Sequence, residues 1–236
     1  MTAGPPSGTV TFVFTDIEGS TALWQDHPQA MAAALARHDE IVRGAIERHH
    51  GYVFSTAGDA FAAAFGSATD AITAISAAQV GLTDEPWNDA VIRVRAGLHT
   101  GEAEERGGDY FGPVLNRGAR IMALAGGRQV LLSQATAELV RDQLASGFDL
   151  HDVGEHRLKS LHRPEHLFQL MGPGLSDRAV EVASAEPSGN LPAGVLDFVG
   201  RHHDLDELRS VVAPGRLVTL TGIGGAGKTQ LATRLA

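Results

Sequence analysis

An apolar segment near the N-terminus runs directly into a carboxylate and a glycine turn. The segment reads VTFVFTDIEGST over residues 10–21. Its β-branched and aromatic residues predict a buried strand, which stops at Asp16. Gly19 follows and allows the backbone to turn closely. Asp16 is therefore a candidate ligand for a cation, although an aspartate at a strand end is also a common turn former.

A second acid stands in the same kind of setting. The segment GYVFSTAGDAFAAAF over residues 51–65 predicts two strands around the Ala57-Gly58 turn, followed by Asp59. If this hairpin lies beside the N-terminal strand, Asp16 and Asp59 meet at one edge of a sheet. Two carboxylates with no nearby lysine repel each other, so the pair suits a divalent cation. The loop after Asp16 can offer backbone N–H groups to phosphate oxygens.

Composition restricts the classes of function. Of the 236 residues, 43% are hydrophobic and 20% charged, as in an ordinary soluble protein with one good-sized domain and a second piece. We find no membrane-length apolar run and no signal-peptide pattern, so we expect a cytoplasmic protein with no membrane partner. The absence of cysteine limits any metal to oxygen or imidazole ligands. The net charge of −9 argues against a nucleic acid partner.

The order of the elements predicts an α+β fold. Expected strands cover residues 9–15, 51–65 (a hairpin), 90–103, 128–133, 149–158 and 166–171. Expected helices cover residues 28–49, 67–82 and 113–125, and another helix follows residue 133. A Gly-rich turn is expected at 106–112. Strands that alternate with helices but include hairpins suggest a sheet layered on one face by helices.

The C-terminal quarter differs in composition. Residues 172–194 are rich in Gly, Pro, Ser and Ala, which predicts a flexible linker. Beyond it, GIGGAGKT fits the P-loop pattern, in which backbone N–H groups wrap phosphates. The motif positions are Gly222, Gly227, Lys228 and Thr229. This part resembles the opening of STAND-type signal-transduction ATPases. We expect residues 195–236 to be a truncated N-terminal piece of a P-loop NTPase domain that does not hydrolyse ATP alone.

Two polar residues share one face of the predicted helix over residues 113–125. Asn116 and Arg120 are four residues apart, which places them on the same side. An amide and a cation on one face can stabilise charge on a transferred phosphoryl group, or can form a solvated surface pair. Asp109, in the preceding Gly-rich segment, is by itself a turn residue.

Five motifs in order resemble the catalytic domain of class III adenylyl/guanylyl cyclases across residues 8–171. They are FVFTDIEGST, STAGDAFAAAF, VRAGLHTGEA, GGDYFGPVLNRGARI and LHRPEHLFQL. The resemblance implies a ferredoxin-like cyclase fold with an antiparallel-rich sheet. It also implies an enzyme that converts ATP to 3′,5′-cyclic AMP and pyrophosphate by two-metal catalysis.

The resemblance also assigns roles to residues. Asp16, Asp59 and the Ile17 carbonyl match the ligands of two Mg²⁺ or Mn²⁺ ions. Asn116 matches the residue that orients the ribose, and Arg120 matches the one that stabilises the α-phosphate. The implied substrate contacts with the phosphates are Ile17, Glu18, Gly19, Ser20, Thr21, Arg95 and Lys159.

Purine recognition is where the sequence departs from the family. Asp109 matches the acceptor for the exocyclic amino group of adenine, but Ser55 stands where adenylyl cyclases carry a lysine. Losing that charged contact costs roughly 1.5–3 kcal/mol and weakens purine selection. ATP is still favoured over GTP, because the Asp109 carboxylate and the guanine carbonyl oxygen are both hydrogen-bond acceptors and cannot bond to each other.

Family active sites form at a head-to-tail dimer interface, so a homodimer is implied. One subunit supplies the metal ligands, and the other supplies the residues for the base and the transition state. The alternative function is a catalytically weak or silent cyclase-like module that dimerises within a STAND-type signalling protein. Ser55 and the attached P-loop permit this second function.

Overall fold

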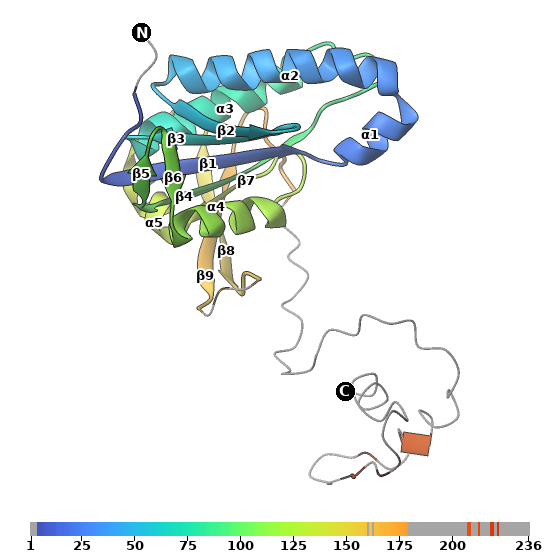
Figure 1. Cartoon of the computed structure of the whole chain (residues 1–236), viewed down its shortest axis with the longest axis vertical. Helices are drawn as coiled ribbons and strands as arrows, with labels where there is room; N and C mark the ends of the chain where they lie inside the picture. The colour runs from blue at the N-terminus through green and yellow to red at the C-terminus, as the bar shows by residue number, and fades with distance from the viewer. Residues whose placement is uncertain are drawn as a thin grey trace. The chain divides into compact units, whose positions relative to one another are not determined.

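Figure 1 shows the computed structural model of the chain, which describes residues 4–159, 161, 163–178, 207, 208, 212, 218, 219 and 221. The chain divides into two units, Met1–Ala183 and Ser184–Ala236. The predicted P-loop residues 222–229 and most of the predicted linker lie outside the described residues.

Strands and helices alternate along the first unit. The strands are β1 (Thr9–Ile17), β2 (Tyr52–Ala57), β3 (Ala60–Phe65), β4 (Val94–Glu102), β5 (Glu104–Arg106), β6 (Asp109–Phe111), β7 (Val130–Ser133), β8 (Asp149–His156) and β9 (Glu165–Met171). The helices are α1 (Ser20–Asp26), α2 (Pro28–Arg48), α3 (Ala68–Asp84), α4 (Pro113–Leu124), α5 (Gln134–Val140) and the 3₁₀ turn η1 (Arg141–Gln143). Within the part of the chain that the structure describes, no helix has the length and apolar character to cross a membrane.

Seven strands form one sheet in the order β2-β3-β1-β4-β7-β9-β8. Every neighbouring pair is antiparallel except β4 and β7, which run parallel. From β1 to β4 the elements follow the β-α-β-β-α-β order, and these four strands pair as β2-β3-β1-β4. That arrangement is ferredoxin-like, as the sequence predicts.

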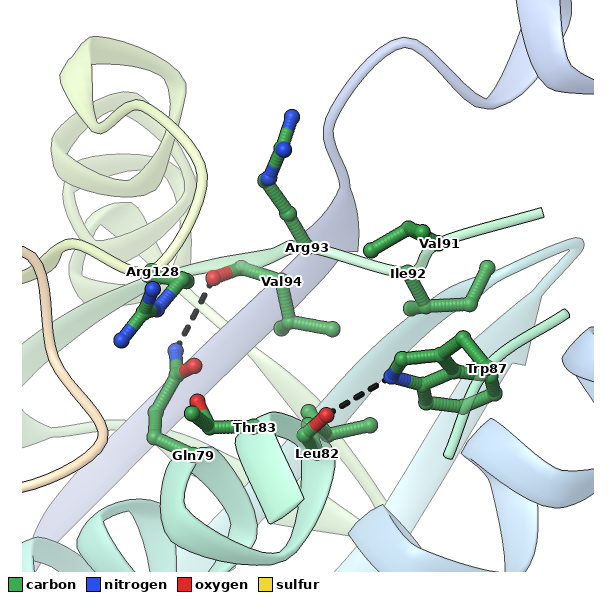
Figure 2. A pocket seen from close by; sticks show the side chains of 9 residues that line it. All are labelled: Gln79, Leu82, Thr83, Trp87, Val91, Ile92, Arg93, Val94 and Arg128. Atoms are coloured by element: carbon green, nitrogen blue, oxygen red, sulfur yellow. Dashed lines mark hydrogen bonds between the residues drawn. The ribbon is translucent and has the colours of Figure 1, made fainter. Parts of the chain in front are cut away.

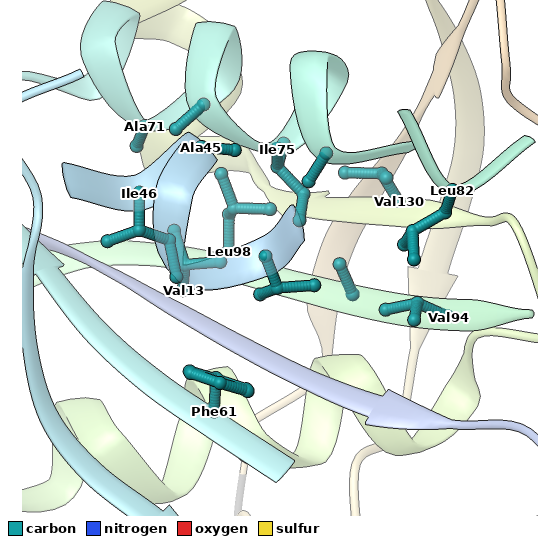
Figure 3. Close-up of a cluster of buried hydrophobic side chains, with 14 of the residues drawn as sticks. Val13, Ala45, Ile46, Phe61, Ala71, Ile75, Leu82, Val94, Leu98 and Val130 are labelled. Atoms are coloured by element: carbon teal, nitrogen blue, oxygen red, sulfur yellow. The ribbon is translucent and has the colours of Figure 1, made fainter. Parts of the chain in front are cut away.

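The main core lies between one face of the sheet and the helices α2, α3 and α5. Val13 and Ile17 of β1 are buried there together with Ile75 of α3 and Leu98 of β4. Figure 3 shows several of these side chains meeting between the ribbons of the sheet and the helices. Alternate residues of a strand point to opposite faces, so Val13 and Ile17 define this one.

The opposite face is also covered, so the expectation of helices on one face is wrong. Val10 and Phe12 point away from the main core and are buried with Val114 of α4. Figure 1 shows α4 on the side of the sheet opposite α2 and α3. The physical reason is that β1 is apolar at both alternating sets of positions, as expected for a strand buried on both faces.

Two predicted loops contain regular structure. Helix α1 follows Gly19 but buries none of its residues, so it carries no apolar periodicity that could reveal it. The predicted Gly-rich turn is a hairpin of β5 and β6 around Gly107 and Gly108. Both glycines have positive φ, 62° and 89°, which is the backbone that a two-residue hairpin turn requires.

The start of the predicted linker packs against the domain. Residues 172–178 follow β9, and Leu175 is 6% exposed within the main core. The Ser176 N–H donates to the Arg128 carbonyl at 2.9 Å. The expectation that the linker begins at residue 172 is therefore wrong, because an apolar anchor follows the Gly-Pro-Gly turn.

Helix α4 approaches β4 so closely that glycine is required between them. A Cβ atom on Gly97 would lie 2.2 Å from the Met122 backbone nitrogen and 2.6 Å from its Cα. We expect Gly97→Ala to lower the free energy of unfolding by about 3 kcal/mol, because the helix backbone must move. Urea denaturation measures this.

The control is Gly44→Ala in α2, where a Cβ would meet only the guanidinium end of Arg48. A helical Gly→Ala change is expected to stabilise the protein by about 1 kcal/mol. Unchanged stability of Gly97→Ala would contradict the close packing of α4 on β4.

Candidate active site

The structure brings Asp16 and Asp59 together, as the sequence predicts. Strand β3 pairs with β1 in antiparallel register, with Phe61 opposite Thr15. The turn before β3 therefore lies beside the end of β1. There the Ile17 N–H donates to Asp59 Oδ2 at 3.1 Å. The two carboxylates flank Ile17 at the end of β1, in the interior of the strand order.

Asp16 already has a cationic partner from β4. The register of β1 against β4 places Arg95 opposite Asp16. Arg95 donates to Asp16 Oδ2 from Nε at 3.0 Å and from Nη2 at 2.5 Å. The two side chains are 30% and 22% exposed, so solvent partly screens this ion pair. In this structure, Arg95 therefore balances the negative charge of Asp16.

The oxygen ligands at the end of β1 suit a hard divalent cation. The described residues contain no group of three or more acidic or histidine side chains that could hold a metal ion. Two carboxylates and the nearby Ile17 carbonyl nevertheless offer oxygen alone. Mg²⁺ is typically held by one or two carboxylates, with waters and substrate phosphates completing its shell. Asp16, Asp59 and the Ile17 carbonyl are the residues that would hold it.

The loop of residues 17–21 turns sharply after the carboxylates. Gly19 has a φ of 67°, in the left-handed region that favours glycine. The Glu18 carboxylate accepts from the Gly127 N–H at 2.8 Å, which attaches the loop to a distant turn. Ser20 begins α1, and Thr21 is exposed.

Ser55 and Asp109 lie in neighbouring parts of the structure. Ser55 is exposed on β2 and Asp109 is exposed on β6. The residues beside them pack together, because the rings of Phe54 and Tyr110 are 5.0 Å apart. Burial raises the pKa of Tyr110 to about 12, and its hydroxyl donates to the Pro6 carbonyl at 2.6 Å. An aromatic cluster thus fixes both predicted base-recognition positions.

Asn116 and Arg120 share the exposed side of α4. Neither side chain forms a hydrogen bond or ion pair within the described part of the chain. In particular, no such contact joins them to Asp16 or Asp59. Lys159 is exposed just after Leu158, which packs with Ile121 of α4.

Two residues near α4 are not among the predicted site residues. Arg117 forms an ion pair with Glu165 of β9 at 3.2 Å. The nearby His99 is buried, which lowers its pKa to about 4, and its Nδ1 lies 2.8 Å from Ser133 Oγ. His99 is therefore neutral near pH 7, as a packed strand residue. Both contacts join residues far apart in the sequence, so no local pattern reveals them.

A pocket of about 150 Å³ lies elsewhere, between α3 and the start of β4. Figure 2 shows Gln79 and Trp87 among its lining side chains, with Gln79 donating to the Val94 carbonyl. None of the predicted site residues lines this pocket. The candidate site is instead formed by the end of β1 and the turn before β3.

Comparison with known proteins identifies relatives of this chain. Residues 3–172 match the family described as the adenylate and guanylate cyclase catalytic domain. An uncharacterised protein of Mycobacterium tuberculosis is 43% identical over 201 residues, which cover 84% of this chain and 68% of that protein. An adenylate cyclase of Neurospora crassa is 32% identical over 231 residues, which cover 74% of this chain and 10% of that protein.

Solved structures resemble the first unit. An adenylate cyclase of Trypanosoma brucei in its monomeric state has a TM-score of 0.67 and 29% identity, over 75% of this chain and 96% of that one. The adenylyl cyclase CyaB from P. aeruginosa has a TM-score of 0.59 at 20% identity, over 72% and 96% of the two chains, and supports the fold alone. The match to the family spans most of the chain, and the chain belongs to the family of adenylate and guanylate cyclase catalytic domains.

Proposed function

We propose that this chain is an adenylate cyclase that converts ATP to 3′,5′-cyclic AMP and pyrophosphate at sites shared by two copies. The observation that carries the proposal is the meeting of Asp16 and Asp59 around Ile17 in a chain of the cyclase family. Paired oxygen ligands beside a glycine turn suit a divalent cation with a bound triphosphate.

Asp16, Asp59 and the Ile17 carbonyl would hold two Mg²⁺ or Mn²⁺ ions. Such ions, when bound, neutralise phosphate charge and make the ribose 3′-hydroxyl a better nucleophile. Arg95, which pairs with Asp16 in this structure, would contact a phosphate oxygen of the nucleotide once a cation takes its place at the Asp16 carboxylate. The open 17–21 loop gives its backbone N–H groups to the other phosphate oxygens.

The second half of each site comes from the partner copy. Asn116 orients the ribose and Arg120 stabilises the charge that develops on the α-phosphate. Their exposure on α4, with no partner in the described part of the chain, supports a role toward a nucleotide held across a two-fold interface. Lys159 lies beside the same helix and would add a phosphate contact.

Asp109 favours adenine, because a carboxylate accepts a hydrogen bond from the exocyclic amino group. Ser55 is too short to reach the ring nitrogen as a lysine would. Selection between ATP and GTP thus depends largely on Asp109, and turnover of ATP is slow for lack of a charged contact to the base.

We expect Ser55→Lys to raise kcat/KM for ATP by about 10-fold or more, the equivalent of restoring one charge-assisted hydrogen bond. Residue 55 is exposed on the edge strand β2, so the fold should accept lysine. Initial rates with ATP and with GTP measure both turnover and selectivity.

Thr56→Lys is the matched control, because it adds the same charge one position along, on the other face of β2. It should leave kcat/KM unchanged. Equal rates for Ser55→Lys and the wild type would mean that residue 55 does not face the base.

A second candidate function is a cyclase-like regulatory module with little or no activity. The ion pair between Arg95 and Asp16 favours it, since that carboxylate is satisfied without a cation. The two functions differ in whether the purified protein forms any cyclic nucleotide.

A further inference from the structure

The segment after the last strand folds back onto the domain. We name residues 172–178 the strap. Leu175 anchors it in the main core at 6% exposure, and the Gly174 carbonyl accepts from Thr83 Oγ1 of α3 at 3.0 Å. The chain then continues toward the second unit, Ser184–Ala236. The strap is therefore the last continuously described segment of the chain before the second unit.

Hydrogen bonds join the strap to the turn before β7, residues 126–129. The Ser176 N–H donates to the Arg128 carbonyl at 2.9 Å, and Arg128 Nε donates to the Gly174 carbonyl at 3.2 Å. Gln129 Nε2 donates to the Arg178 carbonyl at 3.0 Å. Arg128 has a φ of 64°, a conformation that residues other than glycine seldom adopt. The strap helps to hold the turn in this unusual shape.

The other side of the same turn holds the 17–21 loop. The Gly127 N–H donates to Glu18 Oε1 at 2.8 Å, and the Glu18 N–H donates to the Arg93 carbonyl at 2.9 Å. The Arg128 N–H also donates to the Val94 carbonyl at 2.8 Å. Figure 2 shows Arg128 beside Val94, with Arg93 next along the chain. One short turn thus touches both the strap and the loop.

We propose that the strap controls the 17–21 loop through this turn. While the strap is packed against the domain, the Gly127 N–H stays hydrogen-bonded to Glu18 and the loop keeps its position. When the strap is displaced, the loop becomes mobile and binds a triphosphate more weakly. Glu18 is a positioning residue in this link. The effect on substrate rests on the proposed function, whereas the mechanical link does not. An event in the second unit that displaces the strap would thereby regulate the site.

Leu175→Ala in the full chain tests the link by removing the apolar anchor of the strap. Without nucleotide, we expect backbone amides of residues 17–21 to exchange hydrogen about 10-fold faster. With ATP and Mn²⁺, KM should rise about 5-fold and kcat should stay within about 2-fold, because ground-state contacts to the phosphates are lost. Val140→Ala is the control. Val140 belongs to the same core at 1% exposure but lies on α5, so it should change neither exchange at 17–21 nor KM.

Glu18→Ala tests the link from the other side. It removes the carboxylate that accepts from the Gly127 N–H at 2.8 Å and leaves the hydrogen bonds between the strap and residues 126–129 in place. We expect the same rise in loop exchange and in KM, with no faster exchange in the strap. Combining Glu18→Ala with Leu175→Ala should add little, since both break one path.

Faster exchange in the strap without faster exchange in the loop would overturn the link, as would fully additive effects of the two substitutions. These exchange results hold whether or not the protein makes a product. If no cyclic nucleotide forms but the loop responds to Leu175→Ala, the proposed function fails and the link stands.

Discussion

Replacing Asp59 by asparagine is expected to abolish formation of cyclic nucleotide and to leave the fold intact. The amide oxygen of asparagine can still accept the hydrogen bond from the Ile17 N–H, which Asp59 Oδ2 accepts at 3.1 Å. The negative charge that would hold a divalent cation is lost. Metal ions contribute several kcal/mol to such transition states, so activity should fall by about 100-fold or more. The rate of product formation measures this loss.

Two further variants test whether the loss of activity is specific to the charge of Asp59. Asp26→Asn at the end of α1 removes an exposed acid that forms no hydrogen bond or ion pair within the described part of the chain, and it should retain full activity. Asp59→Ala also removes the acceptor for Ile17 and should be no more active than Asp59→Asn. Wild-type rates in either Asp59 variant would refute the assignment of Asp59 as a metal ligand.

Mixing two inactive variants is expected to restore activity. Asp59→Asn disables the half of a site that holds the cation, and Arg120→Ala disables the half that stabilises the α-phosphate. A mixed dimer keeps one intact site, made of Asp59 from one copy and Arg120 from the other. With random pairing, half of the dimers are mixed, so an equal mixture should recover about a quarter of wild-type activity.

The control is a tandem purification with two different tags, which shows that mixed dimers have formed. If those mixed dimers have no more activity than the single variants, the sites are not shared between copies. The exposed Arg120 should not change stability when replaced, so loss of folding would not confuse the result.

Long elements of the fold could be predicted because their burial has a period. In α2, the buried residues Met31, His38, Val42 and Ala45 repeat at three- and four-residue steps or their sums, as an amphipathic helix requires. Helix α1 buries nothing and was not predicted. The position of α4 on the second face also could not be predicted, because it depends on tertiary packing at Gly97 rather than on local pattern.

The candidate site was predictable where residues end strands. Asp16 follows the apolar run of β1 and Asp59 directly precedes the apolar run of β3, and their meeting required only that these two strands be neighbours. The partner of Asp16 could not be predicted, because Arg95 reaches it through the register of β1 against β4. The contact of Glu18 with Gly127 joins two turns that no sequence pattern connects.

The most direct test is product identification with the purified full chain, incubated with ATP or GTP in Mn²⁺ and in Mg²⁺. We predict that ATP yields cyclic AMP and pyrophosphate in equal amounts, that GTP reacts more slowly, and that Asp59→Asn yields neither cyclic product. Absence of any cyclic nucleotide from a protein shown to be dimeric would contradict the proposed cyclase. It would favour the silent regulatory module instead.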